Sequence, residues 1–419
     1  MEYVFINHNG GSPLHGPNMR TYYAAKALYE KGHSVTIVSS SYSHKYVSSP
    51  QMFSLIQKEK IDGINYCWIR TIRYKNLISR IYSHFEFSFK FLLKRKNIFP
   101  KKIDHLIFSG PPPEIFFFSW LISKIYSCKI SADIRDLWPR VQLDMNKFNY
   151  LNPYVLFLFF AQLIMFKLAF RIISPIQNIE KYLNSYGVSE KSYVIENGFD
   201  LDKLPDKKTI NLSIQSLYEH EPDSRFINTA ELRKKYDLII GYSGSFDRDN
   251  ELSKLFDAAE VLQNQTRVLF LLVGGGIKTN LYLNKAKNLS NVLIANRVPA
   301  SDVVNVIRAF DICFVSLKPK PIHKYGIALA KIYEYMAASK PIIWMIDSEV
   351  NIINQSGGGF SCLPNDLDEL IRIIKNLSSM DKSELHKMGN KNFEYLNKYN
   401  SYEYLGSRWN KILRNQNEL

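Results

Sequence analysis

Cysteine is scarce in this chain, and its spacing fits no cysteine-based site. The 419 residues include four cysteines, Cys67, Cys128, Cys313 and Cys362, with no Cys-x-x-Cys pair and no Cys/His cluster. This pattern argues against a structural zinc site and against the disulfide framework of a secreted protein. The N-terminal residues also lack the basic, apolar and small-residue regions of a signal peptide, so we expect an intracellular protein.

Long apolar runs and sequence repeats are missing as well. The longest apolar run, residues 154–166, is shorter than the roughly 20 residues that span a bilayer, so segment 151–170 predicts a buried or interfacial helix. No repeat at a solenoid period is evident. Hydrophobic residues make up 46% of the chain and charged residues 22%, which excludes a disordered protein, and the length allows two or three domains.

Positive charge is concentrated in one segment. The chain has a formal net charge of +15. The segment between residues 70 and 102 is rich in basic residues, and Glu86 is its single acid. Phenylalanine and leucine are interleaved with the basic residues. Such a helix suits an anionic membrane surface or an anionic lipid-linked substrate. An ordinary solvated helix with a core-facing phenylalanine stripe remains an alternative, and nucleic acid is the weakest, because no nucleic-acid-binding motif is present.

Short apolar strands alternate with helical patterns twice along the chain. The predicted strands are Tyr3–Ile6, Val35–Val38, Leu106–Phe108, Lys129–Asp133, Arg171–Ser174 and Tyr193–Glu196, then Leu238–Tyr242, Val268–Val273, Val292–Ala295, Ile312–Val315 and Ile342–Met345. This alternation predicts an α/β fold with two doubly wound, Rossmann-like domains facing each other across a cleft. We expect an N-terminal domain at 1–200, a polar linker or insertion at 201–230, a C-terminal domain at 231–395, and a final helix at 396–419 that packs back towards the N-terminal domain.

Ligands of such sheets bind beyond the carboxyl ends of the strands, so the loops there hold the candidate residues. Gly10-Gly11 allows close backbone approach, but it is not a G-x-G-x-x-G fingerprint, and a dehydrogenase is disfavoured. Arg135-Asp136 follows a strand; it could bind phosphate and deprotonate a hydroxyl, or form an internal ion pair. Lys331 and Glu334 begin a helix, where Glu334 could bind a vicinal diol or simply favour the helix start.

Four ordered motifs resemble a known family. They are IENGFD (195–200), LLVGGG (271–276), NRVP (296–299) and KIYEYMAASKPII (331–343), and they resemble the GT-B retaining glycosyltransferases of family 4. The N-terminal stretch 6–45 and DIRDLWP (133–139) resemble the branch that contains the L-fucosamine transferases of bacterial O-antigen and capsule assembly.

The resemblance implies roles for individual residues. Donor-binding residues would be Gly10, Gly11, Gly244, Gly276, Gly326, Ile327, Lys331 and Glu334, with Glu334 on the nucleotide ribose. The acceptor side would hold His15, Arg20, Arg135 and Asp136. Catalytic residues would be Asp136, Arg248 and Lys331. The family's EX7E motif is broken, because Gly326 stands eight residues before Glu334, so sugar recognition would rest on backbone amides there.

The implied activity is transfer, with retention, of a hexose from a UDP-sugar, such as UDP-N-acetyl-L-fucosamine or a related amino sugar, to a polyprenyl-diphosphate-linked saccharide in O-antigen or capsule biosynthesis. The expected mechanism has an oxocarbenium-like transition state and a leaving UDP that is stabilised by Arg248, Lys331 and helix amides, without metal or cofactor. We expect a peripheral protein on the cytoplasmic face of the membrane, attached through 70–102 and 151–170. The alternatives are a catalytically degenerate GT-B subunit that binds a nucleotide sugar or a partner transferase, and a sugar-nucleotide 2-epimerase.

Overall fold

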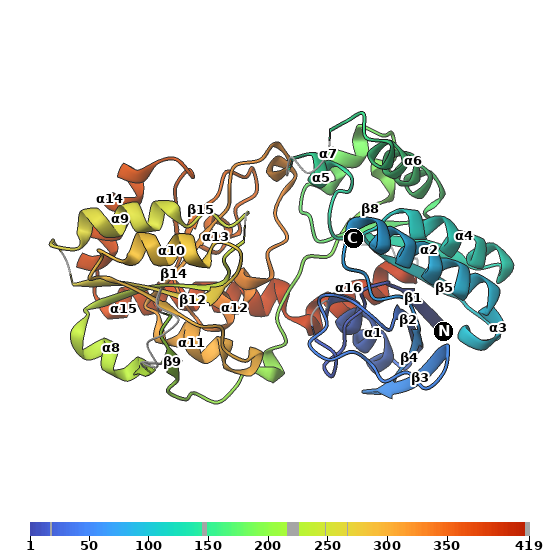
Figure 1. Cartoon of the computed structure of the whole chain (residues 1–419), viewed down its shortest axis with the longest axis horizontal. Coiled ribbons are helices and arrows are strands. Elements are labelled where there is room, and N and C mark those ends of the chain that lie inside the picture. The colour runs from blue at the N-terminus through green and yellow to red at the C-terminus, as the bar shows by residue number, and fades with distance from the viewer. Residues whose placement is uncertain (17–18, 145–148, 216–225, 248, 266, 415–419) are drawn as a thin grey trace. The chain divides into compact units, whose positions relative to one another are not determined.

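The computed structural model describes residues 1–16, 19–144, 149–215, 226–247, 249–265 and 267–414. These form two compact units. Unit 1 consists of Met1–Asn197, Tyr325–Ala328 and the chain from Tyr402, and unit 2 of Gly198–Lys324 and Leu329–Ser401. Each unit has a mainly parallel sheet between helices (Figure 1). The predicted α/β fold with two Rossmann-like domains is therefore confirmed.

Unit 1 is built on an eight-stranded sheet of order β3-β4-β2-β1-β5-β6-β7-β8, in which only the β3–β4 pair is antiparallel. The strands are β1 (Glu2–Ile6), β2 (Ser34–Ser40), β3 (Ile56–Ile61), β4 (Ile64–Ile69), β5 (His105–Gly110), β6 (Lys129–Ile134), β7 (Ile172–Ser174) and β8 (Ser192–Val194). The helices are α1 (Met19–Glu30), α2 (Leu77–Leu93), α3 (Arg95–Ile98), α4 (Glu114–Ile125), α5 (Arg140–Asp144), α6 (Pro153–Leu168), α7 (Ile179–Asn184) and α16 (Tyr402–Leu413). The strand order reverses between β1 and β5, which marks the place where ligands of this fold bind.

The core of unit 1 explains why its central strands are buried along almost their whole length. Helices cover both faces of the sheet, so Tyr3–Ile6 is buried at every position rather than at alternate ones. One face packs Phe5 against Tyr22 and Trp409, and the indole of Trp409 meets the ring of Phe5 edge-on with centroids 6.1 Å apart.

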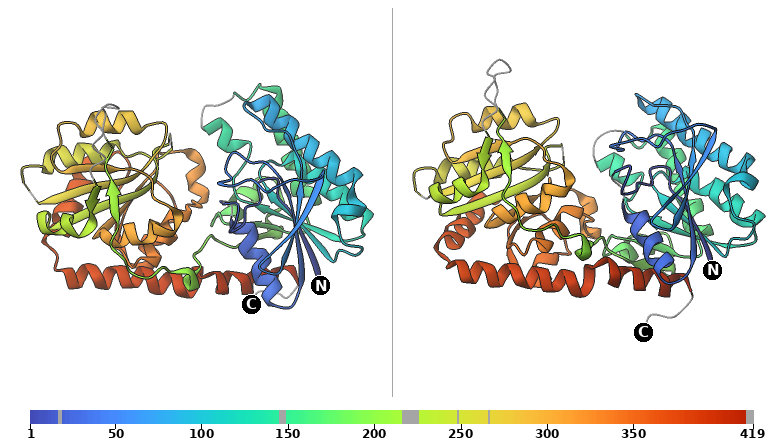
Figure 2. Two further views of the ribbon diagram at one scale, coloured as in Figure 1. Left: turned by 60° about the horizontal axis from the view of Figure 1, so that its bottom comes forward. Right: turned by 90° about the horizontal axis from the view of Figure 1, so that it is seen from below.

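The C-terminal helix α16 belongs to this core. Figure 2 shows red α16 beside blue α1. The rings of Tyr23 and Tyr402 stack with centroids 3.6 Å apart, and Gly406 lies so close to α1 that an added Cβ would be 2.3 Å from the Cβ of Ala27.

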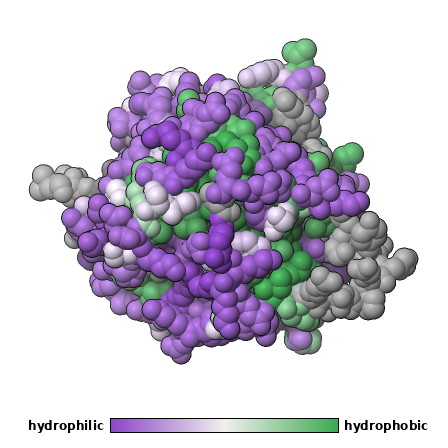
Figure 3. Space-filling model, turned by 90° about the vertical axis from the view of Figure 1, so that its left-hand side faces the viewer, coloured by the Kyte–Doolittle hydropathy of each residue, from purple (hydrophilic) through white to green (hydrophobic). Residues whose placement is uncertain are grey.

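Unit 2 has a fully parallel six-stranded sheet of order β13-β12-β11-β14-β15-β16, which reverses between β11 and β14. Its strands are β11 (Leu238–Ser245), β12 (Val268–Gly275), β13 (Val292–Ala295), β14 (Ile312–Ser316), β15 (Ile342–Met345) and β16 (Gly359–Ser361). Its helices are α8 (Thr229–Lys235), α9 (Ser253–Leu262), α10 (Thr279–Ala286), α11 (Val303–Ala309), α12 (Ala330–Ala337), α13 (Ile352–Ser356), α14 (Leu367–Ser379) and α15 (Lys382–Tyr395). The surface shown in Figure 3, on the side of unit 2, is mostly hydrophilic.

Part of the predicted linker 201–230 is ordered secondary structure of unit 2. β9 (Asn211–Ser213) and β10 (Phe226–Asn228) form an antiparallel pair, and α8 follows directly. Gln215 continues from β9 and donates through Nε2 to the carbonyl groups of Gly274 and Ala295. Strands of three residues are too short for a periodic pattern, which is why the sequence gives no signal for them.

Candidate functional site

In unit 2, helix α12 brings two ionisable side chains to the carboxyl end of β11. The Lys331 ammonium donates to the hydroxyl of Tyr242 at 2.6 Å and to Oδ1 of Asn250 at 3.1 Å. The hydroxyl of Tyr335, one turn further along α12, accepts from the amide of Ser243 and donates to its carbonyl. These contacts hold α12 in register against the strand at the switch point.

Burial shifts the pKa values of both ionisable groups. Burial lowers the pKa of Lys331 to about 8, although the carboxylates of Glu334 and Asp247 act in the opposite direction. Burial also raises the pKa of Glu334, and Lys331 opposes that shift. The Glu334 carboxylate has no hydrogen-bond donor among the residues that the structure describes, so it is free to accept hydrogen bonds from a ligand.

Two predicted glycines shape the loops around this pair. Gly244 has φ +149, and an added Cβ would lie 2.9 Å from the Lys331 ammonium. A Cβ at Gly276 would lie 2.9 Å from the backbone of Phe246, and the Gly276 amide donates to the hydroxyl of Thr279. Gly244 therefore borders Lys331 directly, whereas Gly276 allows two loops to pack closely.

Other cations at this edge were not singled out from the sequence. Arg248, the predicted diphosphate ligand, lies outside the described residues. Lys278 follows β12, and its ammonium donates to the Asn250 carbonyl at 3.4 Å. Lys320 follows β14 and forms an ion pair with Asp249 at 2.5 Å. Both lie in loops at the carboxyl ends of predicted strands, where ligands were expected. No sequence motif, however, marks a lysine in such a loop as a binding residue.

The backbone at Gly326 and Ile327 was predicted to bind the donor sugar, and the structure gives it a different set of contacts. This segment belongs to unit 1. The Ile327 amide donates to Oε1 of Gln177 at 3.1 Å, so it already has a partner. Gly326 has φ +107, and a Cβ there would lie 2.3 Å from the same Oε1. These two residues therefore pack against Gln177 within unit 1, and their role in donor binding stays a prediction.

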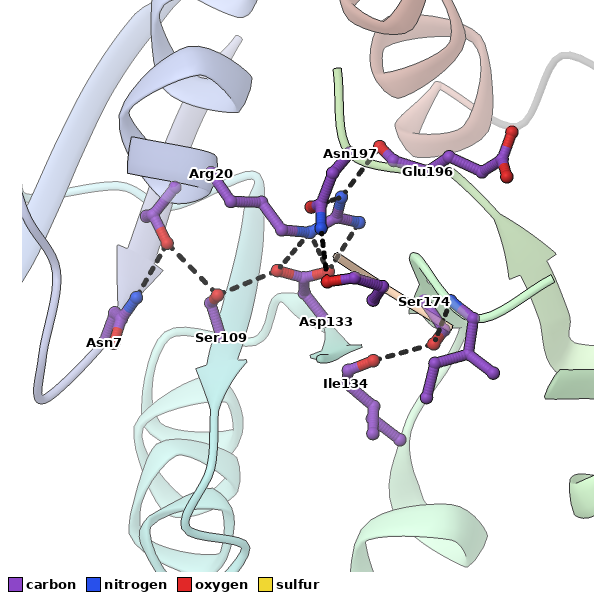
Figure 4. A network of polar contacts seen from close by, with 11 residues as sticks. Asn7, Arg20, Ser109, Asp133, Ile134, Ser174, Glu196 and Asn197 are labelled. Carbon is purple, nitrogen blue, oxygen red and sulfur yellow. Dashed lines mark hydrogen bonds and ion pairs between the residues drawn. The ribbon is translucent and has the colours of Figure 1, made fainter. Parts of the chain in front are cut away.

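In unit 1, Arg20, a predicted acceptor-side residue, forms a buried ion pair. Its guanidinium contacts the Asp133 carboxylate at 3.0 Å and donates to the Glu196 carbonyl and the Asn197 amide oxygen (Figure 4). Ser109 donates to the same carboxylate at 2.8 Å. The Arg20 side chain is 9% exposed. The polar contacts of Arg20 with the described residues therefore lie within unit 1, and its acceptor-side role stays a prediction.

The loop after β1 is also more internally bonded than predicted. The Gly10 amide donates to the carbonyl of Asn7 and to the hydroxyl of Ser39, both at 3.0 Å, and the Gly11 carbonyl accepts from Tyr66. His15 is buried, with Nδ1 2.7 Å from the Ser12 hydroxyl, and burial lowers its pKa. The Gly10 amide and the His15 imidazole thus hold the loop in shape.

The predicted Arg135-Asp136 pair lies in a cluster of cations that sequence reasoning did not collect. Burial lowers the pKa of Lys45; Asp136 raises it, and Arg135 and Arg80 lower it further. The Nε atoms of Arg80 and Arg135 are buried without a hydrogen-bond partner among the described residues. Partly buried guanidinium groups without partners are costly, so this cluster is suited to an anionic ligand.

A second group of titratable side chains lies below this cluster. His84 on α2 contacts Oε1 of Glu114 on α4 at 3.1 Å, and the rings of His8 and His84 meet edge-on with centroids 4.8 Å apart. Burial raises the pKa of Glu114 to about 7 and lowers that of His84 to about 3. All three side chains are at most 3% exposed, so they support the site without being open to a substrate.

The described residues contain neither a metal-binding cluster nor a membrane-spanning helix. Among the described residues, no group of three or more His, Cys, Asp or Glu side chains could hold a metal ion. No helix in that part of the chain has both the length and the apolar character that are needed to cross a bilayer.

Comparison with known proteins identifies both halves of the chain. Residues 15–203 match the family described as Glycosyltransferase Family 4, and residues 237–380 match Glycosyl transferases group 1. A relative, probable glycosyltransferase WbjE of Pseudomonas aeruginosa, is 26% identical over 169 residues. That match covers 39% of this chain and 41% of the relative.

Solved structures resemble the whole chain. Sucrose-phosphate synthase of Thermosynechococcus elongatus has a TM-score of 0.71 at 14% identity, covering 99% of this chain and 98% of its own. A trehalose-6-phosphate protein of E. coli bound with UDP-2-fluoro glucose has a TM-score of 0.71 at 12% identity, with 99% of each chain covered. Anabaena HepE in complex with UDP-glucose has a TM-score of 0.63 at 15% identity, covering 99% of this chain and 100% of its own. Residues 15–203 therefore match one glycosyltransferase family and residues 237–380 another, and the whole chain has the α/β fold of the GT-B glycosyltransferases.

Proposed function

We propose that the protein transfers a sugar from a UDP-sugar to a lipid-linked saccharide. The observation that carries this proposal is the pair Lys331 and Glu334 on α12, at the switch point of the unit 2 sheet. A carboxylate without a protein donor can accept both hydroxyl groups of a ribose. The Lys331 ammonium uses two of its three donors on Tyr242 and Asn250, which leaves one for a phosphate oxygen.

Relatives in the fold support UDP as the nucleotide. HepE is in complex with UDP-glucose in one structure and with UDP in another, and the E. coli protein is bound with UDP-2-fluoro glucose. In our proposal the donor diphosphate lies near Lys331 and Arg248, and their charges stabilise the leaving UDP as the anomeric carbon becomes oxocarbenium-like. Transfer proceeds with retention, and no metal or other cofactor takes part.

The cluster of Lys45, Arg80 and Arg135 supports an acceptor that carries phosphate. A polyprenyl-diphosphate-linked saccharide has a diphosphate for these cations and a sugar hydroxyl that Asp136, which is exposed, could orient. The motifs 6–45 and 133–139 support an amino-sugar donor of the UDP-N-acetyl-L-fucosamine type and a role in O-antigen or capsule assembly.

An apolar surface of unit 1 supports attachment to the cytoplasmic face of the membrane. The helices α2, α4 and α6 pack side by side through Phe85, Phe118 and Phe157. Their outer side, which we call the unit 1 apolar face, consists of exposed Leu77, Ile78, Tyr82, Phe89, Leu93, Phe117, Ile125, Leu156, Phe157, Phe160 and Leu163. Exposed Lys94, Lys96 and Lys167 flank it. A patch of apolar and cationic side chains fits an anionic lipid surface.

Calorimetric titration with UDP tests the nucleotide site. We expect Glu334→Gln to weaken UDP binding by about tenfold or more, because a hydrogen bond to a charged group contributes about 1.5–3 kcal/mol. Glu260→Gln, on the exposed side of α9, is the matched control and should bind UDP as the wild type does. Equal affinities of the two variants would contradict the assignment of Glu334 to the ribose. UDP binding without sugar transfer to any acceptor would support the degenerate subunit instead.

A further inference from the structure

Unit 2 contains a second cavity that the donor site does not use. It has a volume of about 620 Å³, within the range of small-molecule pockets. Its wall combines the segment after residue 203, the C-terminal ends of α11 and α12, and α15. Neither Lys331 nor Glu334 lines it, although Ala337 and Ala338 of the same helix do.

The wall of this cavity is strongly cationic. Its formal positive charges are those of Lys207, Lys208, Arg233, Arg308 and Lys340, and His386 stands beside them. Of the described residues in the wall, none is acidic. Phe393 and the alanines supply the apolar part.

Only two of the five cationic side chains form an ion pair with a described residue. Lys208 forms an ion pair with Asp302, and Arg233 forms one with Asp311 while it also donates to the carbonyl at the end of α11. Arg308 donates only to neutral oxygens, those of Pro205 and Asn305. The ammonium groups of Lys207 and Lys340 have no ion-pair partner among the described residues. Burial lowers the pKa of Lys340, Cys313 and the Asp311 carboxylate act in the opposite direction, and Arg233 and Lys207 lower it further, so these cations lie near one another.

We infer that this cavity binds a small, soluble phosphorylated molecule with at least two negative charges. Three uncompensated cations around one concave surface repel one another, and a phosphate group bound between them removes that repulsion. An arginine can bind phosphate oxygens in pairs, and the two lysines add point charges in the same wall. The adjoining alanines and Phe393 leave room for an organic group beyond the phosphates.

Binding and localisation are measured with sodium tripolyphosphate as the probe. We expect saturable binding in calorimetry at 50 mM salt. Hydrogen–deuterium exchange should slow in peptides that cover 204–209 and 337–340. The variant Lys207→Gln/Lys340→Gln should weaken binding by about tenfold or more and abolish this protection. Lys287→Gln/Lys375→Gln removes the same charge from exposed positions elsewhere in unit 2 and should change nothing.

Four results would overturn the inference. The first is a lack of saturable binding. The second is protection confined to 242–250 and 329–334, which would place the polyanion at the donor site. The third is an equal loss of affinity in both double variants, which would mean unspecific attraction. Vesicles that contain phosphatidylglycerol should leave 204–209 unprotected; protection by vesicles and not by tripolyphosphate would make a lipid headgroup the ligand and would also contradict the proposal.

Discussion

The ammonium group of Lys331 gives the proposed donor site a charge that depends on pH. Its pKa of about 8 means that it is mostly protonated at pH 7 and mostly neutral at pH 9. Because a neutral amine cannot pair with phosphate, UDP binding should weaken by up to about tenfold between these pH values. Calorimetric titration of UDP at pH 7, 8 and 9 measures this.

Two variants of Lys331 control the pH experiment. Lys331→Arg stays charged and should bind UDP with little pH dependence in this range, and Lys331→Met should bind weakly at every pH. A wild-type affinity that is the same at pH 7 and pH 9 would show that the Lys331 charge does not contact the diphosphate.

Arg20 provides a prediction about stability. Arg20→Met leaves Asp133 buried without its cation, so we expect a loss of about 3–5 kcal/mol in the free energy of unfolding. Four of the five tryptophans, Trp68, Trp120, Trp138 and Trp409, are in unit 1, so urea unfolding followed by tryptophan fluorescence reports on this unit. Lys26→Met, on the same helix, removes only a surface pair with Glu30 and should cost less than about 1 kcal/mol. If Arg20→Met unfolds like the wild type but loses acceptor binding, the predicted acceptor role was right.

Site residues could be found from the sequence where they follow a motif. Lys331 and Glu334 stand in a run that has the family's spacing, and their contacts agree with a shared site. Lys45 and Arg80 could not be found in this way, because they reach Arg135 from a loop and from a helix far away in the sequence. The ion pair of Arg20 with Asp133 could not be predicted, because an arginine near the start of a helix looks the same in sequence whether it faces a ligand or a buried carboxylate.

At the scale of elements, the unit 1 apolar face predicts binding to lipid. The protein should float with vesicles that contain phosphatidylglycerol at low salt, and less so at high salt, since screening weakens the lysine contribution. Ile78→Ser/Leu93→Ser/Phe160→Ser should reduce flotation severalfold. Leu363→Ser/Ile277→Ser changes similarly exposed residues of unit 2 and should not. A wild-type protein that stays in the soluble fraction would rule out the proposed attachment.

The close contact between α1 and α16 predicts that a single methyl group added at Gly406 lowers the free energy of unfolding. Gly406→Ala should destabilise the protein by about 1–3 kcal/mol, because the new Cβ would collide with Ala27. The double variant Gly406→Ala/Ala27→Gly restores the space and should recover part of the loss. Ser407→Ala, on the exposed side of the helix, should stay within about 0.5 kcal/mol of the wild type. Urea unfolding decides between these outcomes, and a neutral Gly406→Ala would mean that α16 is not packed tightly on α1.

Buried central elements were predictable and short edge elements were not. β1, β5 and β12 are buried at nearly every position because helices cover both faces, so each contains a continuous apolar run in the sequence. The hairpin of β3 and β4 was missed, since β3 is polar at the sheet edge and reads as a loop. The segment 70–102 was predicted as one basic helix, and it contains α2 and the short α3.

At the scale of the whole molecule, two Rossmann-like units carry the two kinds of chemistry that glycosyl transfer needs. Unit 2 holds a carboxylate and a lysine at its switch point, and unit 1 holds a cluster of cations in which two buried guanidinium nitrogens have no hydrogen-bond partner among the described residues. Our central claim is that these groups bind a UDP-sugar and a phosphorylated acceptor for the same reaction. The cationic cavity of unit 2 is independent of that claim.

The most direct test of this claim is UDP release and sugar transfer in one assay. The protein is incubated with radiolabelled UDP-sugars, one at a time, and with polyprenyl-diphosphate-linked saccharides extracted from bacterial membranes. We predict that one UDP-sugar yields UDP and labelled lipid in equal amounts, and that Glu334→Gln reduces both by about tenfold or more. If a folded protein that binds UDP yields neither labelled lipid nor UDP with any donor, the account is contradicted.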